Sequence, residues 1–322
     1  MNGKNLNVQY RRNSYAKKRI RVIAAITAIF LVILVVLFFV IGRLLKDKVD
    51  EDRKENSGSD LPTVTAPLGH AELPSVNGYG LSLSGATNQT ISDKVSAIAS
   101  AEGNCINFVA RADTGEEIYS SAVAKNMGKQ TASSGYVSVG DITSRAKNRG
   151  LRVSAILPIN AFDVSDDLER SVLLAYDAAI CAELSREGAD DVLVSLSGVE
   201  VTEENIYELI RLAESVKNID PEVLIGISLG RAMLEAEGSE MLVSKLWEAY
   251  DFFAYDISEV EEGVDVRTFA EESVNSEVHY YLLRYNIRVL LPVLEDDDLD
   301  GVVSVLTGKG LSNWQTVESW RG

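Results

Sequence analysis

Two carboxylic acids, Asp256 and Glu295, lie at the ends of apolar runs of the sequence and could act together in acid–base chemistry. Hydrolysis of a glycosidic bond uses two carboxyl groups, about 5–5.5 Å apart in a retaining enzyme and about 6.5–9.5 Å apart in an inverting one. Asp256 lies in the run FFAYDI (252–257) and Glu295 follows IRVLLPV (287–293), so the two acids come from consecutive strand candidates. They are the candidate catalytic residues. The alternative interpretation is that both are solvated loop acids.

Other side chains near these runs could bind a ligand. Arginine and carboxylate groups hydrogen-bond readily, and an aromatic ring can pack against the face of a sugar. The candidate ligand-binding residues are Arg111, Asp113, Tyr255, Trp314 and Gln315. For Trp314, packing at the bottom of a barrel is an equally good interpretation, because most aromatic side chains serve the core.

Two serines, Ser195 and Ser197, end the stretch GADDVLVSLSG (188–198) and share one face of the predicted strand. A nucleophilic serine requires a base such as histidine within hydrogen-bond reach. The sequence contains only two histidines, His70 in a predicted linker and His279 in a predicted amphipathic helix. No G-x-S-x-G motif is present either. The serines are therefore predicted to be small polar residues that close a strand.

No cofactor and no metal site are expected. The run DDDLDG (296–301) fits the start of a calcium loop, but Thr307 occupies the twelfth position, where a bidentate glutamate is required. An acidic first turn of a helix explains this run equally well. The two cysteines, Cys105 and Cys181, fall in a predicted strand and a predicted helix, which favours two separate core thiols over a disulfide.

Eight short apolar runs alternate with segments of helical period from residue 79 onward. The predicted strands are 79–84, 105–110, 151–157, 191–196, 223–228, 252–257, 287–293 and 313–317, and the predicted helices are 91–103, 141–150, 166–188, 202–218, 234–250, 265–286 and 299–310. This order predicts an α/β fold, a (β/α)8 TIM barrel, whose functional residues lie at the carboxyl ends of the strands. The alternative is a doubly wound open sheet, but the sequence has no G-x-G-x-x-G loop.

The N-terminal segment 22–42 is apolar, and only Thr27 is polar between Ile23 and Ile41. About 20 apolar helical residues cross a bilayer. Seven cations precede the segment and three follow it, so the positive-inside rule places the N-terminus in the cytoplasm. A cleaved signal peptide is the alternative, but its apolar region is about 7–15 residues long. The predicted organisation is a basic cytoplasmic tail (1–21), a transmembrane signal anchor (22–42), a flexible stalk (43–77) and an extracytoplasmic barrel (78–322).

Charge divides the chain in the same way. Residues 1–50 contain 10 lysines and arginines and 2 aspartates, whereas the remainder contains 21 cations and 46 acids, a net charge of −25. A domain of this charge repels nucleic acid, and the sequence has no basic cluster that would overcome the repulsion. Nucleic-acid binding is therefore excluded as a predicted function.

Several segments of residues 78–320 are similar to a known family. These segments are NCINFVARADTGEEIYSS (104–121), GLRVSAILPINAFD (150–163), AYDAAICAELSREGADDVLVSL (175–196) and FFAYDIS (252–258). Their order and spacing resemble the candidate glycoside hydrolase barrels of Gram-positive surface proteins, which are distantly similar to chitinase-like barrels. The resemblance implies a glycoside-hydrolase-type barrel at the cell envelope.

The resemblance also implies an altered active site. In the chitinase-like pattern the face that carries Leu193, Ser195 and Ser197 here bears two aspartates and then a glutamate that donates the proton. The surface-barrel family has an aspartate where Ser195 stands. A serine hydroxyl cannot replace that acid, because protonation of a leaving oxygen needs a group with a pKa tunable toward neutrality.

The predicted function is therefore a degenerate barrel that binds or senses a cell-envelope glycan. One alternative is an active hydrolase that uses the relocated acids Asp256 and Glu295. The other alternative is a structural envelope protein that presents its surface to other proteins.

Overall fold

The computed structural model describes residues 74–317 except positions 84, 102, 113–114, 130–137, 197–200, 204, 259, 261–263 and 295. The predicted tail, the predicted signal anchor at 22–42 and the predicted stalk as far as residue 73 lie outside the described residues. None of the helices in the described part of the chain is long and apolar enough to cross a membrane.

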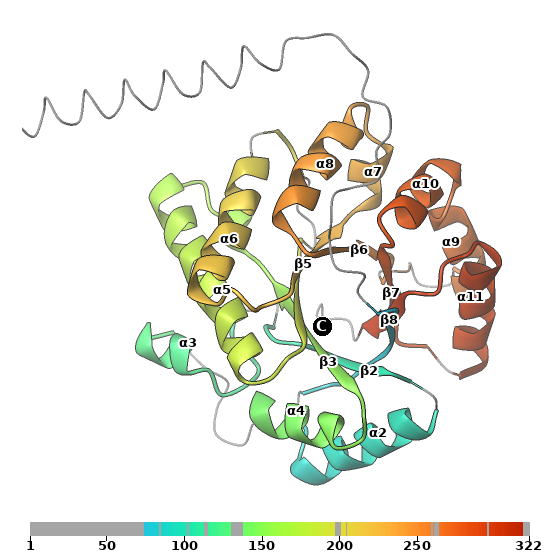
Figure 1. Ribbon diagram of the computed structural model, residues 1–322, viewed down its shortest axis with the longest axis horizontal. Helices are drawn as coiled ribbons and strands as arrows, with labels where there is room; N and C mark the ends of the chain where they lie inside the picture. Colours follow the sequence, from blue (N-terminus) through green and yellow to red (C-terminus); the bar gives the residue numbers. More distant parts are fainter. Residues whose placement is uncertain are drawn as a thin grey trace, which may run out of the picture. The chain divides into compact units, whose positions relative to one another are not determined.

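Eight parallel strands form a closed barrel in chain order (Figure 1). The strands are β1 (Asn77–Gly80), β2 (Cys105–Val109), β3 (Arg152–Pro158), β4 (Asp191–Ser195), β5 (Ile225–Leu229), β6 (Phe252–Asp256), β7 (Arg288–Pro292) and β8 (Trp314–Val317). Pairing of β8 with β1 closes the ring, with Gly78 opposite Gln315. The structure confirms the predicted (β/α)8 barrel.

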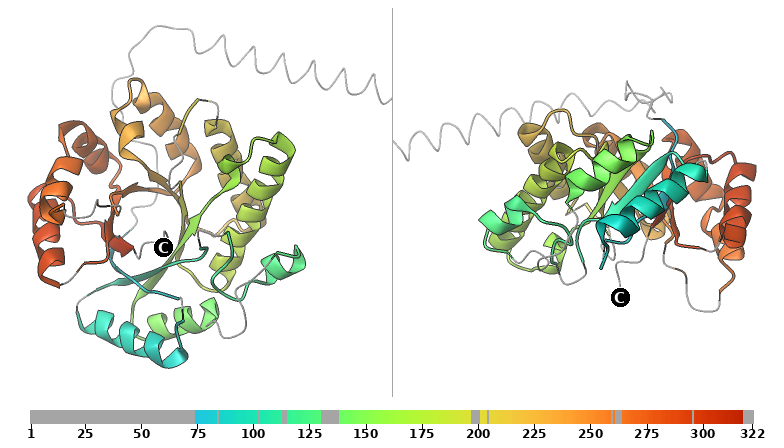
Figure 2. Two further views of the ribbon diagram at one scale, coloured as in Figure 1. Left: turned by 180° about the vertical axis from the view of Figure 1, so that it is seen from behind. Right: turned by 90° about the horizontal axis from the view of Figure 1, so that it is seen from below.

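Helices surround the ring of strands on its outer side (Figures 1 and 2). They are α2 (Asn88–Ser100), α3 (Ala122–Asn126), α4 (Val139–Lys147), α5 (Asp167–Arg186), α6 (Ile206–Ile219), α7 (Arg231–Glu235), α8 (Ser239–Ala249), α9 (Val266–Ser273), α10 (Ser276–Arg284) and α11 (Asp296–Gly308), with a 3-10 turn at Ala161–Asp163. Residues 296–301 thus form the first turns of α11, as the helical interpretation of the acidic run predicts.

Two segments that were each predicted as one helix form two helices in the structure. The segment 234–250 is divided between α7 and α8, because Gly238 adopts a left-handed backbone conformation with φ of 82°. Glycine adopts this conformation without the steric cost of a Cβ atom. The segment 265–286 is divided between α9 and α10, and Val274 between them has left the helical conformation. Helix α3 was not predicted.

The side chains inside the barrel form a cluster separate from the larger core that lies between strands and helices. The interior cluster contains Val109, Ile156, Leu193, Phe252, Ala254, Leu290 and Val317. Gly226 on β5 faces this interior, because a Cβ atom at this position would lie 2.3 Å from the Phe252 ring. The aromatic ring fills the space that a side chain on β5 would otherwise occupy.

The barrel begins slightly before the predicted boundary at residue 78. Val76 is fully buried, and its carbonyl oxygen accepts a hydrogen bond from the Trp314 backbone N–H at 2.8 Å. The last residues of the predicted stalk therefore belong to the barrel. Cys105 and Cys181 are both buried and unbonded to each other, which confirms their prediction as separate core residues.

Candidate functional site

Side-chain alternation along the strands identifies the inward-facing residues at the carboxyl end of the barrel. Since Val109, Leu193, Ala254 and Leu290 belong to the interior cluster, positions separated from them by two residues face inward as well. The inward-facing residues that close the eight strands are Gly80, Val109, Pro158, Ser195, Ser228, Asp256, Pro292 and Val317. We call this set the mouth. Its members are small, apolar or hydroxylic, with Asp256 as the single carboxylic acid.

Asp256 ends β6 and is partly exposed at the mouth. Its Oδ1 atom accepts hydrogen bonds from the backbone N–H of Ser258 at 2.9 Å and from the Ser258 hydroxyl at 2.6 Å. These bonds hold the carboxylate against the turn that follows the strand. Asp256 thus lies at the carboxyl end of its strand, and its role as a catalytic acid stays a prediction.

Ser195 and Ser228 provide the hydroxyl groups of the mouth. Ser228 Oγ accepts a hydrogen bond from the Leu196 backbone N–H at 2.9 Å, which links the ends of β4 and β5. Ser195 is fully buried, and its Oγ atom has no hydrogen-bond partner among the residues that the structure describes. His279 does not serve as a base for it, because its Nε2 atom contacts the Lys309 carbonyl oxygen at 2.7 Å. The described residues therefore include no activating base for Ser195.

Arg111 was predicted to bind a ligand, but the structure places it in a buried ion cluster. Its guanidinium lies 2.9 Å from Glu117 Oε1 and 2.7 Å from Asp177 Oδ1, and it donates to the Pro158 carbonyl oxygen at 3.0 Å. Only 3% of Arg111 is exposed. Burial raises the pKa of Asp177, although the adjacent Arg111 opposes this rise. Arg111 therefore holds the segment that follows β2 through these buried contacts. Its side chain does not face solvent at the mouth.

A second carboxylate on α5 fixes the same segment. Glu183 accepts hydrogen bonds from the Tyr119 hydroxyl at 2.8 Å and the Ser121 hydroxyl at 2.5 Å. It also accepts from the backbone N–H groups of Ala122 and Val123, at 2.7 and 3.0 Å. The end of the sequence EEIYSS (116–121) is therefore attached to α5 through Glu183. Figure 1 shows α3 and α5 beside each other.

Three more predicted ligand-binding residues lie away from the mouth: Tyr255, Trp314 and Gln315. Tyr255 is fully buried on the outer face of β6, and its hydroxyl donates to the Ser273 carbonyl oxygen at 2.9 Å. Trp314 is the first residue of β8, so it lies at the amino end of the barrel, where its ring makes an edge contact with Tyr79. Gln315 is fully buried, with its amide nitrogen 3.8 Å from Cys105 Sγ.

The other two predicted site residues, Asp113 and Glu295, lie outside the described residues. Glu295 follows β7 in the sequence, next to the strand that ends in Asp256. The pairing of Asp256 with Glu295 as two catalytic carboxylates stays a prediction. In the part of the chain that the structure describes, no group of three or more histidine, cysteine, aspartate or glutamate side chains could hold a metal ion.

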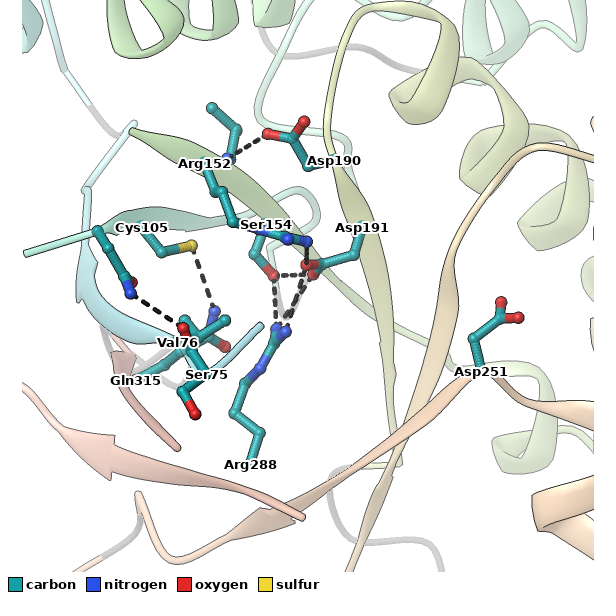
Figure 3. Close-up of polar contacts among 12 residues, drawn as sticks. Ser75, Val76, Cys105, Arg152, Ser154, Asp190, Asp191, Asp251, Arg288 and Gln315 are labelled. Carbon is teal, nitrogen blue, oxygen red and sulfur yellow. Dashed lines mark hydrogen bonds and ion pairs between the residues drawn. The ribbon is translucent and has the colours of Figure 1, made fainter. Parts of the chain in front are cut away.

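A polar network at the amino end of the barrel was not predicted from the sequence (Figure 3). Asp191 accepts from the Ser154 hydroxyl and lies 3.1 Å from Arg288 Nη1 and 3.3 Å from Arg152 Nη2. Burial alone would raise the pKa of Asp191, but Arg288, with Ser154 and Arg152, lowers it below its ordinary value. Functional residues of these barrels lie at the opposite end, so this network is interpreted as stabilising the fold.

Comparison with known proteins supports the fold assignment. No family model matches the chain, and no curated protein matches it. A candidate alpha-L-fucosidase from Bacteroides thetaiotaomicron VPI-5482 has a similar structure, with a TM-score of 0.53 and 12% sequence identity over 82% of this chain and 90% of that chain. A GH18 chitinase from Pseudoalteromonas aurantia gives a TM-score of 0.46 at 11% identity, over 76% and 94% of the two chains. The likeness to the fucosidase shows the barrel fold that this chain shares with a glycoside hydrolase.

Proposed function

We propose that this protein is a glycoside-hydrolase-like barrel that binds or senses a cell-envelope glycan without hydrolysing it. The observation that carries the proposal is the composition of the mouth, in which Asp256 is the single carboxylic acid among eight inward-facing strand ends. Glycoside hydrolysis by either common mechanism uses two carboxyl groups on opposite sides of the scissile bond. Among the residues of the mouth that the structure describes, one acid and two serines can hydrogen-bond sugar hydroxyls, and no second carboxyl group accompanies them.

The end of β4 supports the loss of catalysis. Ser195 stands there in place of the acid that the resembling barrels carry, and it is fully buried, with no hydrogen-bond partner in the described part of the chain. An unactivated hydroxyl cannot protonate a leaving oxygen. The fold shared with a candidate fucosidase agrees with a carbohydrate as the ligand class.

The proposal includes a location at the cell membrane. The apolar segment 22–42 would anchor the chain as a single span, with the basic tail in the cytoplasm and the barrel outside. The acidic barrel agrees with a role away from nucleic acid.

A second candidate function is hydrolysis by Asp256 and Glu295. The placement of Asp256 favours it, since this acid is partly exposed and faces the mouth from β6. Glu295 follows β7, the neighbouring strand. In this alternative one of the two acids would protonate the leaving oxygen, and the other would act as nucleophile or base.

Co-sedimentation tests the binding proposal. The full chain in detergent is incubated with insoluble cell-wall glycan and a panel of insoluble polysaccharides, and the bound fraction is measured. We expect at least one glycan to retain the protein, and Asp256→Asn to weaken that binding by about tenfold, the effect of losing about 1.4 kcal/mol. Asp93→Asn, on the exposed face of α2, is the matched control and should bind normally. Absence of binding to every glycan would refute the proposal.

A further inference from the structure

A groove between α6 and α8 lies on the outer surface of the barrel, separate from the mouth. Its volume is about 780 Å³, within the range of about 300–1,000 Å³ that is common for small-ligand sites. Ile210, Ala249 and Tyr250 supply its less exposed part. The remaining lining residues are Tyr207, Glu214, Lys217, Asn218, Lys245, Glu248 and Asp251. The groove therefore combines an aromatic and aliphatic surface with several polar side chains.

Tyr207 is the exposed aromatic residue of this groove. It lies in the first turn of α6, and 59% of it is accessible to solvent. The Lys245 ammonium from α8 lies 5.3 Å from the centre of the Tyr207 ring, so the ring and the cation line the groove together. An exposed aromatic surface of this kind can pack against the apolar C–H face of a sugar ring.

The polar side chains of the groove differ in whether they already form ion pairs or hydrogen bonds within the protein. Lys217 is committed to the fold, since its ammonium lies 2.7 Å from Asp251 Oδ2 and donates to the Val223 carbonyl oxygen. Glu214, Glu248 and Lys245, in contrast, form no ion pair or side-chain hydrogen bond with the residues that the structure describes. Two acceptors and one donor group are therefore available to a ligand.

We propose that this groove is a second glycan-binding site, specific for a neutral oligosaccharide. The Tyr207 ring would pack against one sugar unit, while Glu214, Glu248 and Lys245 would hydrogen-bond its hydroxyl groups. A sugar hydroxyl both donates and accepts, so it matches carboxylate and ammonium partners alike.

Charge and length limit the ligand further. The two unpaired acids, in a chain whose residues 51–322 carry a net charge of −25, oppose a polyanionic ligand. Tyr207 and Glu214 are separated by seven residues on α6, or about 10 Å along the helix axis at 1.5 Å per residue. The groove therefore suits an oligosaccharide of more than one unit rather than a monosaccharide. This site is independent of the mouth, so either proposal can fail alone.

Saturation-transfer NMR tests the groove with the full chain in detergent and three neutral hexasaccharide probes, chitohexaose, cellohexaose and laminarihexaose. We expect saturation transfer to at least one probe, and Tyr207→Ala to weaken its apparent affinity by about tenfold, as loss of an aromatic contact does. Lys245→Ala should weaken it as well. Tyr280→Ala is the matched control, because Tyr280 is 49% exposed on α10 and also lies beside a cation, Arg284, but is outside the groove.

Three outcomes would overturn the groove proposal. No transfer to any of the three probes would exclude a site for neutral oligosaccharides. Equal losses from Tyr207→Ala and Tyr280→Ala would show that exposed tyrosines bind sugars without a defined site. If Asp256→Asn removes binding while Tyr207→Ala leaves it intact, the mouth is the binding site and the groove is not. The reverse pattern would support the groove and exclude the mouth for that probe.

Discussion

Asp191 shows how an ionisable residue is retained in the barrel interior. The carboxylate is almost fully buried, and it is stabilised by Arg288, Arg152 and the Ser154 hydroxyl. Removing one partner of a buried ion pair leaves the other charge uncompensated and costs about 3–5 kcal/mol. The network therefore holds β3, β4 and β7 together across the amino end of the barrel.

We expect Asp191→Asn to lower the free energy of unfolding by about 3–5 kcal/mol at neutral pH, because Arg288 would remain buried without a counter-charge. Urea denaturation of both proteins measures this difference. Asp190→Asn is the control, since Asp190 is partly exposed beside Lys147 and an amide oxygen could still accept from the Val153 N–H. The control should lose less than about 1 kcal/mol. Similar losses in both variants would contradict the assigned role of the network.

The same residue predicts a pH dependence. The pKa of Asp191 is lower in the folded state than the ordinary value of 3.8, so the stabilisation is complete above that value and is lost as the pH falls through the folded-state pKa. The free energy of unfolding should therefore decline as the pH falls below that ordinary value, and less steeply in Asp191→Asn. Denaturation curves at successive pH values test this. Parallel declines in the two proteins would show that Asp191 does not contribute.

Among the structural elements, the segment between β2 and α3 depends most clearly on a single side chain. Glu183 of α5 accepts four hydrogen bonds from Tyr119, Ser121, Ala122 and Val123. Removal of the carboxylate would therefore leave four donors of this segment without their present acceptor. We infer that Glu183 fixes the position of α3.

Replacement of Glu183 by alanine should therefore loosen residues 115–129 without unfolding the barrel. Amide hydrogen exchange should increase in this segment, because local opening costs less free energy once the acceptors are gone. Glu187→Ala is the control, since Glu187 lies one turn further along and is exposed. Unchanged exchange at 115–129 in Glu183→Ala would contradict this account of the segment.

The pairing of β5 with β6 leads to a prediction about packing. A Cβ atom on Gly226 would lie 2.3 Å from the Phe252 ring, so Gly226→Ala should destabilise the protein by about 1–3 kcal/mol through overpacking. Gly308→Ala at the end of α11 is the control, because a Cβ atom there meets no neighbour within 4 Å. Thermal unfolding compares the two variants. A neutral Gly226→Ala would show that the Phe252 ring can move aside.

The elements also show what the sequence could predict. Apolar runs predicted all eight strands because a parallel barrel buries both faces of each strand. The same burial hides which residues face inward. The ligand-binding interpretation of Trp314 and Gln315 assumed the carboxyl end of β8, whereas Trp314 begins the strand, as its alternative interpretation as a packing residue expected. Arg111 could not be assigned from the sequence, because its partner Asp177 lies on α5, far along the chain.

For the whole molecule, the distribution of charge and apolar sequence supports an envelope protein. An acidic barrel follows a basic and apolar N-terminal segment. If residues 22–42 anchor the chain, the protein should stay in the membrane fraction after an alkaline carbonate wash, because a transmembrane helix resists extraction. Deletion of 22–42 should release it. Release of the intact chain by carbonate would contradict the proposed anchor.

Hydrolysis is the activity that distinguishes the two candidate functions. A working glycosidase needs a second carboxyl group, and Asp256 is the one acid among the described residues of the mouth. A positive assay would therefore point to Glu295, or to another acid outside this set, as the second group. A structural envelope protein, the remaining alternative, would bind no glycan at all. These outcomes differ in both binding and cleavage.

The most direct measurement is the release of new reducing ends from cell-wall glycan and a polysaccharide panel by the full chain. We predict no release from any substrate, including those that retain the protein in co-sedimentation, because the mouth contains one carboxylic acid. Release that both Asp256→Asn and Glu295→Gln abolish would contradict the account and would identify a hydrolase with relocated acids.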